Sequence, residues 1–181
     1  MTKGGIVRAR LCCRSRLGRY GGHRLGLEVK LMDSPDFDEA IERNHTWLSE
    51  FIKGNVEPAK EMFSHRDDVS LAGPQATAHR GSIPIAHGWE QVSETLESAI
   101  QNFRKGQVTA FENIATYASG DLGFTVEVER FKAQVGGSQE LAPVALRVTS
   151  IFRREEGDWR VVHRHADPIT AVQALESIVQ A

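Results

Sequence analysis

Cysteine is scarce in this chain, and long hydrophobic runs are absent. The two cysteines, Cys12 and Cys13, are adjacent, and neighbours in sequence rarely form a structural disulfide. The fold is therefore expected to form without disulfides, as is usual in a reducing compartment. No apolar stretch approaches the roughly 20 residues that span a bilayer. These absences exclude a disulfide scaffold and a membrane-spanning helix, and they favour a cytoplasmic protein without a membrane partner.

The overall excess of charge is also small, but the charge is unevenly distributed. The 181 residues carry a formal net charge of −2. Residues 1–31 hold eight basic side chains and one acid, which leaves 14 basic and 23 acidic residues in the remainder. An acidic surface repels a phosphate backbone, so we expect no nucleic-acid partner for the main part of the protein.

The basic segment 1–31 lacks the apolar region of a secretory signal peptide. An Arg-rich segment with a single acid is compatible with an organelle transit peptide or with a basic arm that contacts nucleic acid. The interpretation we favour is a disordered extension, with Met32 as an alternative start. It would precede one domain that spans residues 32–181.

The order of the predicted elements indicates an α+β fold. Ser34 is a candidate N-cap, and apolar residues at helical spacing follow Pro35. Later segments are rich in β-branched and aromatic residues and are separated by Gly-containing turns. The predicted helices are 35–53, 56–64, 88–106, which includes Phe103, and 168–181 with Asp167 as its N-cap. The predicted strands are 107–119, 122–135, 141–154 and 158–166, with a further short strand in 65–74.

The final hairpin allows an estimate of strand register. A three-residue loop 155–157 would place Gly157 at the position that needs a left-handed backbone. The pairs would then be Arg153–Trp159, Ile151–Val161, Thr149–His163 and Arg147–His165. Because side chains alternate across a strand, all eight would lie on one face. The opposite face would carry Val148, Phe152 and Val162 among others, and it would be an outward surface suited to an interface.

His163 and His165 therefore join Arg147 and Thr149 in one predicted cluster, with Glu129 on the preceding strand close by. A carboxylate beside an arginine and a histidine suits acid–base chemistry or anion binding. The two histidines could also be metal ligands with a third from His65, His79 or His87, or they could be structural. We expect no metal and no cofactor.

Several segments of the sequence resemble a known family. The segments "DLGFTVEVER" and "APVALRVTSIFRREEGDWRVVHRHADP", with helices first, resemble the SnoaL-like branch of the nuclear transport factor 2-like superfamily. The segment "FRREEGDWRVVHRHAD" also resembles the end of the association domain of calcium/calmodulin-dependent kinase II. The resemblance covers about residues 36–168.

The resemblance implies a cone-shaped, cystatin-like α+β fold with an internal pocket between the helices and a curved, mostly antiparallel sheet. It also implies a homodimer formed through the outer sheet surface. His165, His163 and Glu129 would then be catalytic, and Arg147 and Thr149 would bind substrate. Trp47, Phe51 and Tyr117 are further candidates for the pocket wall, although the spacing of Trp47 and Phe51 is also typical of core.

Two classes of function remain open for such a fold. The first is an isomerase, cyclase or dehydratase that moves protons on an apolar carbonyl or carboxylate compound. The second is a module without catalysis that binds a ligand or forms oligomers.

Overall fold

A computed structural model of the chain describes residues 35–73 and 85–169. The predicted extension 1–31, His79 and most of the predicted C-terminal helix lie outside these ranges. None of the helices in the described ranges has the length and apolar character needed to cross a membrane. The elements are α1 (Pro35–Phe51), α2 (Glu57–Met62), β1 (Ser70–Ala72), β2 (Ile85–His87), α3 (Trp89–Ile100), β3 (Phe103–Ser119), β4 (Leu122–Val135), β5 (Leu141–Glu155) and β6 (Asp158–Pro168).

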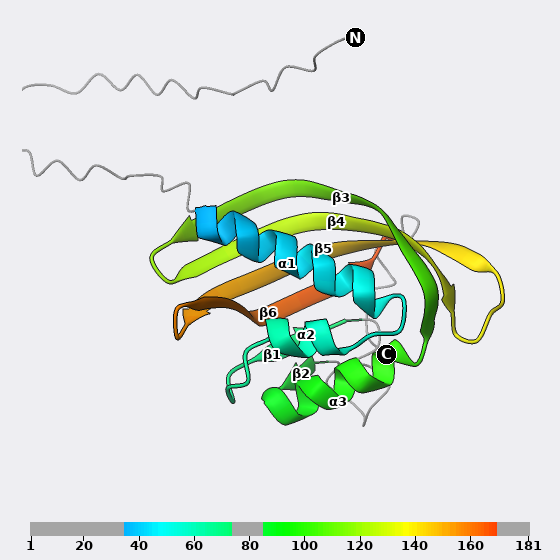
Figure 1. Cartoon of the computed structure of the whole chain (residues 1–181), viewed down its shortest axis with the longest axis horizontal. Helices are drawn as coiled ribbons and strands as arrows, with labels where there is room; N and C mark the ends of the chain where they lie inside the picture. Colours follow the sequence, from blue (N-terminus) through cyan, green and yellow to red (C-terminus); the bar gives the residue numbers. More distant parts are fainter. Residues whose placement is uncertain (1–34, 74–84, 170–181) are drawn as a thin grey trace, which may run out of the picture. The chain divides into compact units, whose positions relative to one another are not determined.

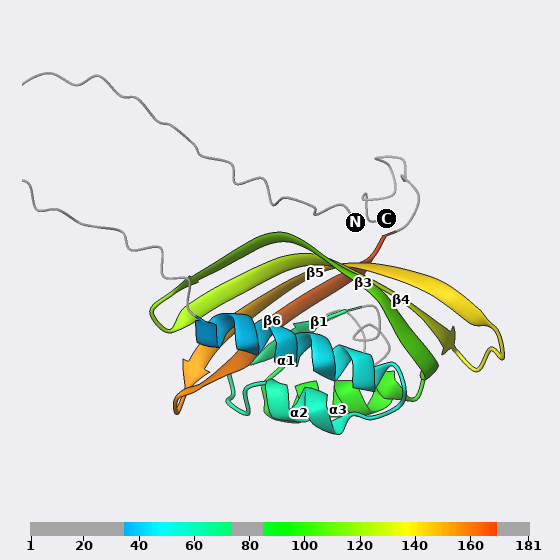
Figure 2. The ribbon, with the colours of Figure 1, turned by 45° about the horizontal axis from the view of Figure 1, so that its top comes forward.

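The strands form one curved sheet in the order β2-β1-β6-β5-β4-β3. Every neighbouring pair is antiparallel except β1 and β6, which run parallel. Figures 1 and 2 show α1, α2 and α3 together on the concave face of the sheet. The predicted fold class, helices packed on a curved and mostly antiparallel sheet, is therefore confirmed.

Helix α1 lies across the sheet because its apolar residues recur at helical spacing. Phe37, Ala40, Trp47, Leu48 and Phe51 are all buried, and a stripe of this kind must face an apolar partner. Phe37 packs edge-on against Phe152 of β5, with ring centroids 5.3 Å apart. The core thus lies between α1 and the inner face of β4, β5 and β6.

The predicted register of the last hairpin is wrong. Glu155 pairs with Asp158, so the turn contains two residues, Glu156 and Gly157, and not three. Both have positive φ, 53° and 94°, as a type I′ turn requires. The pairing also contains a register shift, between Ile151 and Phe152.

The register shift changes which side chains share a face. Phe152 pairs with Val161 before the shift, whereas Ile151 pairs with His163 after it. Val148 and Phe152, predicted to form an outward interface, are 2% and 0% exposed in the core. The sequence could not reveal this irregularity, because one extra residue on β6 leaves the alternating pattern intact on each side of it.

Two predicted helix boundaries are also wrong. Helix α3 ends at Ile100, and Phe103 begins β3. Gly106 explains this: its N–H donates to the carbonyl of Ile52 at 2.9 Å, and a Cβ there would lie 2.4 Å from the Ile52 side chain. The chain around Gly106 therefore runs as the strand β3 close beside Ile52, at the end of α1, and does not continue the helix α3.

At the other end, the predicted N-cap and first helical residue, Asp167 and Pro168, belong to β6. Pairing with β5 continues to Leu146–Pro168. The next residue, Ile169, still donates to the carbonyl of Ala145 at 2.8 Å. This pairing extends the strand beyond the end that the sequence predicts.

The turn geometry gives a test of the register. Glu156 has positive φ, which costs a residue of this type on the order of 1 kcal/mol, whereas asparagine tolerates it well. Glu156→Asn should therefore raise the free energy of unfolding, measured by urea titration, by on the order of 1 kcal/mol. Glu140→Asn, at an exposed turn position, is the control and should be neutral. Equal effects of the two substitutions would favour the three-residue loop.

Candidate functional site

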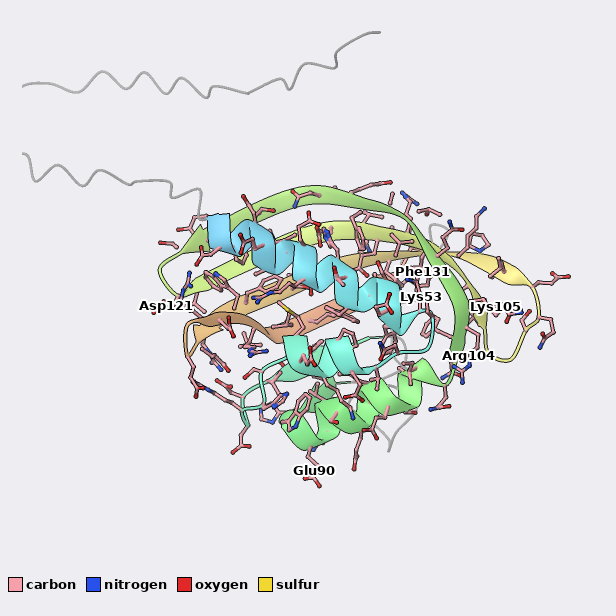
Figure 3. The ribbon with its side chains drawn as sticks, viewed as in Figure 1. Lys53, Glu90, Arg104, Lys105, Asp121 and Phe131 are labelled. Carbon is pink, nitrogen blue, oxygen red and sulfur yellow. The ribbon has the colours of Figure 1, made fainter. Side chains whose placement is uncertain are left out.

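A cavity of about 240 Å³ lies between the helices and one end of the sheet. Its wall includes Trp47 and Phe51 from the second half of α1, Ala99 from α3 and Phe131 from β4. Figure 3 labels Phe131 near the end of β4 that is remote from Asp121, the residue at the β3–β4 hairpin. Nearly the whole wall is apolar, as is usual for small-molecule sites. Among the described residues that line the cavity, Arg164 alone is charged.

Arg164 lies on the inner face of β6 and forms a buried ion pair with Glu129 of β4. Each terminal nitrogen of the guanidinium donates to one carboxylate oxygen, at 2.9 and 2.7 Å. The side chains are 4% and 1% exposed. The Arg164 guanidinium also lies 5.0 Å from the ring centroid of Trp47. A two-point contact to a carboxylate together with an aromatic face suits arginine and would not suit lysine.

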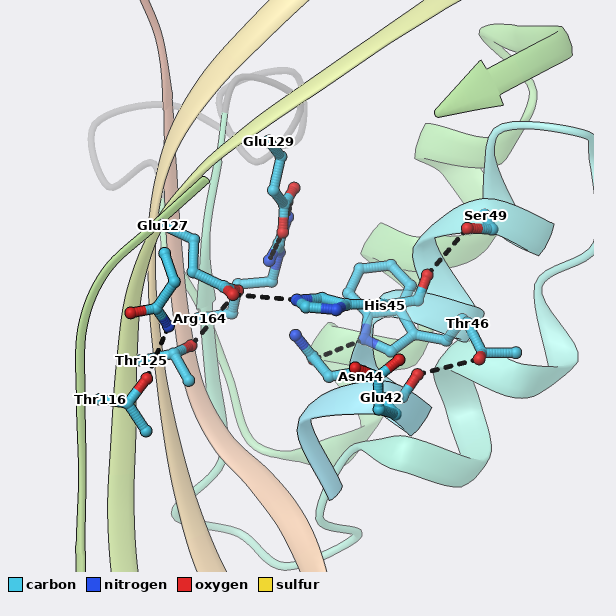
Figure 4. Close-up of polar contacts among 12 residues, drawn as sticks. Glu42, Asn44, His45, Thr46, Ser49, Thr116, Thr125, Glu127, Glu129 and Arg164 are labelled. Atoms are coloured by element: carbon cyan, nitrogen blue, oxygen red, sulfur yellow. Dashed lines mark hydrogen bonds and ion pairs between the residues drawn. The ribbon is translucent and has the colours of Figure 1, made fainter. Parts of the chain in front are cut away.

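A second buried carboxylate, Glu127, lies two residues earlier on the same face of β4. It accepts a hydrogen bond from Nε2 of His45 at 2.9 Å, and Figure 4 shows this contact linking α1 to the sheet. The imidazole of His45 stacks on Phe111, with centroids 3.8 Å apart and planes 10° apart. Two buried carboxylates therefore lie side by side, one hydrogen-bonded to the guanidinium of Arg164 and the other to the imidazole of His45.

Three buried polar atoms have no partner within the described part of the chain: Nδ2 of Asn44, Oγ of Ser150 and Nε1 of Trp159. Unpartnered polar atoms are rare in protein interiors because burial removes their hydrogen bonds to water. Asn44 and Ser150 adjoin the carboxylates: Asn44 precedes His45, and Ser150 pairs with Thr125 and with Arg164 in neighbouring strands.

The predicted cluster of Arg147, Thr149, His163 and His165 does share one face of the sheet. Thr149 pairs with His165, and Arg147 pairs with Asp167. That face, however, is the outer one, because Arg164, between the two histidines, points inward. None of the four lines the cavity. Their predicted position in the pocket is wrong, and the misplaced register explains the error.

The other predicted residues fall into two groups. Glu129 is buried beside Arg164, and Trp47 and Phe51 line the cavity. Tyr117 is half-exposed and pairs with Phe124 on the outer face of the β3–β4 hairpin. Trp47 and Phe51 thus line the cavity, whereas Glu129 lies beside Arg164 outside the wall, and the catalytic or binding roles of all three stay predictions.

His163 has a different environment from the one predicted. Its Nδ1 lies 2.8 Å from Oγ of Ser70 on β1, and His165 lies beside Asp167, with Nε2 3.2 Å from Oδ1. Partial burial, and then the nearby charge of His165, lower the pKa of His163 below its ordinary value of 6.5. In the described ranges no three His, Cys, Asp or Glu side chains meet in a way that could hold a metal ion.

Sequence reasoning missed Arg164 and His45. Alternation along the strand places Arg164 with Val162 on the face opposite the histidines, and the sequence predicts that this face points outward. A signal was present, since Arg164 lies between histidines on a strand whose other inward residues are apolar. His45 gave no signal, because it is a single polar residue on an amphipathic helix.

The model of the SnoaL-like domain family matches residues 41–170 of the chain. No curated protein matches the chain. Among solved structures, a nuclear transport factor 2-like superfamily protein from Salmonella enterica serovar Typhimurium is similar. It has a TM-score of 0.60 and 18% sequence identity, and the match covers 78% of this chain and 94% of that chain.

Two further solved structures carry more specific names. One, from Streptomyces avermitilis, has a name that suggests a dehydratase of the same superfamily; its TM-score is 0.59 and its identity 20%, and the match covers 76% of this chain and 100% of that chain. The other, from Thiobacillus denitrificans, has a name that suggests a calcium/calmodulin-dependent protein kinase type II association domain. Its TM-score is 0.53 and its identity 15%, with 74% and 94% of the two chains covered. At these identities the similarity shows the fold alone.

The partial burial of His163 on the outer face predicts a lowered pKa, which can be measured. Because burial favours the neutral imidazole, an NMR titration should give a pKa below 6.5. His165→Gln should raise this pKa in part only, since burial is the larger cause, and His65→Gln should leave it unchanged. By linkage, His163 contributes stability above about pH 6.5 that is lost as the pH falls through its folded-state pKa. A pKa at or above 6.5 would contradict this placement.

Proposed function

Because the chain belongs to the SnoaL-like domain family, we propose that it binds a small, largely apolar compound that carries a carbonyl or carboxylate oxygen. We further propose that it moves protons on this compound as an isomerase, cyclase or dehydratase. The single observation that supports the proposal is an apolar cavity in which Arg164 is the one charged group among the described residues of the wall.

The size and lining of the cavity favour a compound of one or two rings. A dry cavity of about 150 Å³ is known to hold benzene, and this cavity measures about 240 Å³. Its aromatic and aliphatic wall would contribute affinity through apolar burial, roughly 25 cal/mol per Å².

Arg164 can bind the ligand oxygen and stabilise negative charge that develops on it. Glu129 occupies two of the five N–H donors of the guanidinium, which leaves donors for an oxygen in the cavity. Because Glu129 and Trp47 hold the guanidinium in place, its charge is oriented before the ligand arrives, and such preorganised groups stabilise an enolate-like transition state efficiently.

The same inner face supplies groups that can exchange protons. Glu129, which the sequence analysis predicts as catalytic, lies directly behind Arg164, and the Glu127–His45 pair lies beside it. Carboxylates and imidazoles are the usual general acids and bases. In this proposal Glu129 orients Arg164 and accepts a proton from a ligand that reaches it.

A thermal-shift screen of small cyclic ketones and carboxylates tests the cavity. Binding to the folded state raises the apparent melting temperature by mass action. Ala99→Phe fills the cavity and should abolish every shift, whereas Ala142→Phe, at an exposed position of β5, should preserve them.

Arginine variants decide which of the two arginines contacts the ligand. The paired change Glu129→Leu with Arg164→Met avoids leaving a buried charge without a partner, and it should abolish the shift caused by compounds that need the guanidinium. Arg147→Ala, on the outer face, should preserve that shift. The reverse result would move the ligand to the outer face and contradict the proposal.

A second candidate function is assembly, and an exposed apolar row on the outer sheet face favours it. Tyr117, Phe124 and Ile151 are cross-strand neighbours on β3, β4 and β5, and 36% or more of each is exposed. Exposed apolar surface of this kind favours self-association. The association-domain name of one structural neighbour points the same way.

Light scattering at micromolar concentration tests the assembly proposal. The wild-type protein should be a homodimer, and Phe124→Glu should shift it to monomer because it would bury a charge in the interface. Leu141→Glu, at an exposed position away from the row, should remain dimeric. A wild-type monomer would count against assembly and leave the cavity proposal untouched.

A further inference from the structure

We propose that the ligand of the cavity carries an uncharged oxygen, as in a ketone or an alcohol, which binds at a polar subsite formed by Asn44 and Ser150. This inference rests on the proposed function and narrows it, because it selects a neutral ligand over a carboxylate.

The orientation of Asn44 is determined by its neighbour Trp47. The indole Nε1 of Trp47 donates to Oδ1 of Asn44 at 2.7 Å. An indole nitrogen can only donate, so the amide oxygen must face Trp47 and the amide nitrogen must face elsewhere. Figure 4 shows that nitrogen turned from α1 toward the sheet. It is buried and has no partner in the described part of the chain.

Ser150 supplies the second unpartnered group from the sheet. It is fully buried on the inner face of β5. Its cross-strand neighbours are Thr125 on β4 and Arg164 on β6. A hydroxyl can donate and accept, yet Oγ of Ser150 contacts no hydrogen-bonding group among the described residues.

Neither group belongs to the cavity wall itself, but both adjoin residues that do. Asn44 is hydrogen-bonded to Trp47, and Ser150 lies beside Arg164 in the next strand. Trp47 and Arg164 both belong to the cavity wall. In this proposal a ligand whose apolar part occupies the cavity extends a short polar group past Trp47 and Arg164, between α1 and the sheet, and reaches the two unpartnered groups.

The charges around the subsite favour an uncharged group. Glu129 is already matched by Arg164, and Glu127 is already hydrogen-bonded to His45. A carboxylate ligand would therefore enter beside two buried carboxylates whose partners are already engaged. A ketone or hydroxyl oxygen would instead accept hydrogen bonds from Asn44 and Ser150 and satisfy both orphaned donors.

A matched set of probes with one skeleton tests this inference: indane, 2-indanol, 2-indanone and indane-2-carboxylate. Affinities would be measured by ligand-observed NMR on the full chain. The alcohol and the ketone should bind wild-type protein about fivefold to tenfold more tightly than indane, as one or two added hydrogen bonds allow. The carboxylate should bind more weakly than the ketone.

Ser150→Ala is the informative variant, because it removes a hydroxyl that has no partner in the free protein. It should erase most of the advantage of 2-indanone and 2-indanol while leaving the affinity of indane unchanged. Ser64→Ala is the control: Ser64 is equally buried, but its hydroxyl already donates to Glu155 at 2.9 Å, whereas Oγ of Ser150 has no partner among the described residues. This control should preserve the advantage.

The outcomes separate this inference from the proposed function. If indane binds but the ketone and alcohol gain nothing, or if Ser150→Ala leaves their advantage intact, then water or no group fills the subsite and the inference is overturned. Tightest binding of the carboxylate would overturn it as well. Each of these three results leaves the cavity as a ligand site. If no probe binds wild-type protein, the inference and the proposed function fail together.

Discussion

The buried ion pair between Glu129 and Arg164 is the interaction on which the interior of this protein depends. Removing either partner would leave a charge in an apolar environment, which is strongly unfavourable. The pair therefore requires Glu129 of β4 and Arg164 of β6 to point to the same side of the sheet, across the intervening strand β5. It also holds the guanidinium against Trp47, at the boundary between the core and the cavity.

The part of the interior around this ion pair contains more polar side chains than a core selected for stability alone would contain. Glu127, His45 and Asn44 lie between α1 and the sheet, where apolar side chains would pack at lower cost. Local departures from the rule that cores are apolar tend to coincide with functional sites. This polar layer meets the apolar cavity at Arg164, and the combination of an apolar compartment with a charged group in its wall underlies both proposals.

The sequence predicted the class of fold and the strands well, because alternation and Gly-containing turns are local signals. It failed on the face of the last hairpin, because the register shift beside Ile151 inverts which alternate residues of β6 point inward. The adjacent apolar residues Val161 and Val162 conceal this inversion in the sequence. The sequence predicts His163 and His165 as catalytic residues of the pocket, yet Arg164 between them is the residue that points inward. The position of Glu129 follows from the clean alternation of its strand, whereas the same reasoning places its partner Arg164 on the wrong face of the sheet.

The most direct test of this account is a double-mutant cycle on the Glu129–Arg164 pair, with the free energy of unfolding measured in urea for wild type, Glu129→Gln, Arg164→Met and the double variant. The account predicts that each single change costs about 3–5 kcal/mol. It also predicts that the double variant costs clearly less than the sum, because the unpaired charge is gone. Small, additive effects of both substitutions would mean that the two side chains do not meet in the interior, and the proposed site would lose its foundation.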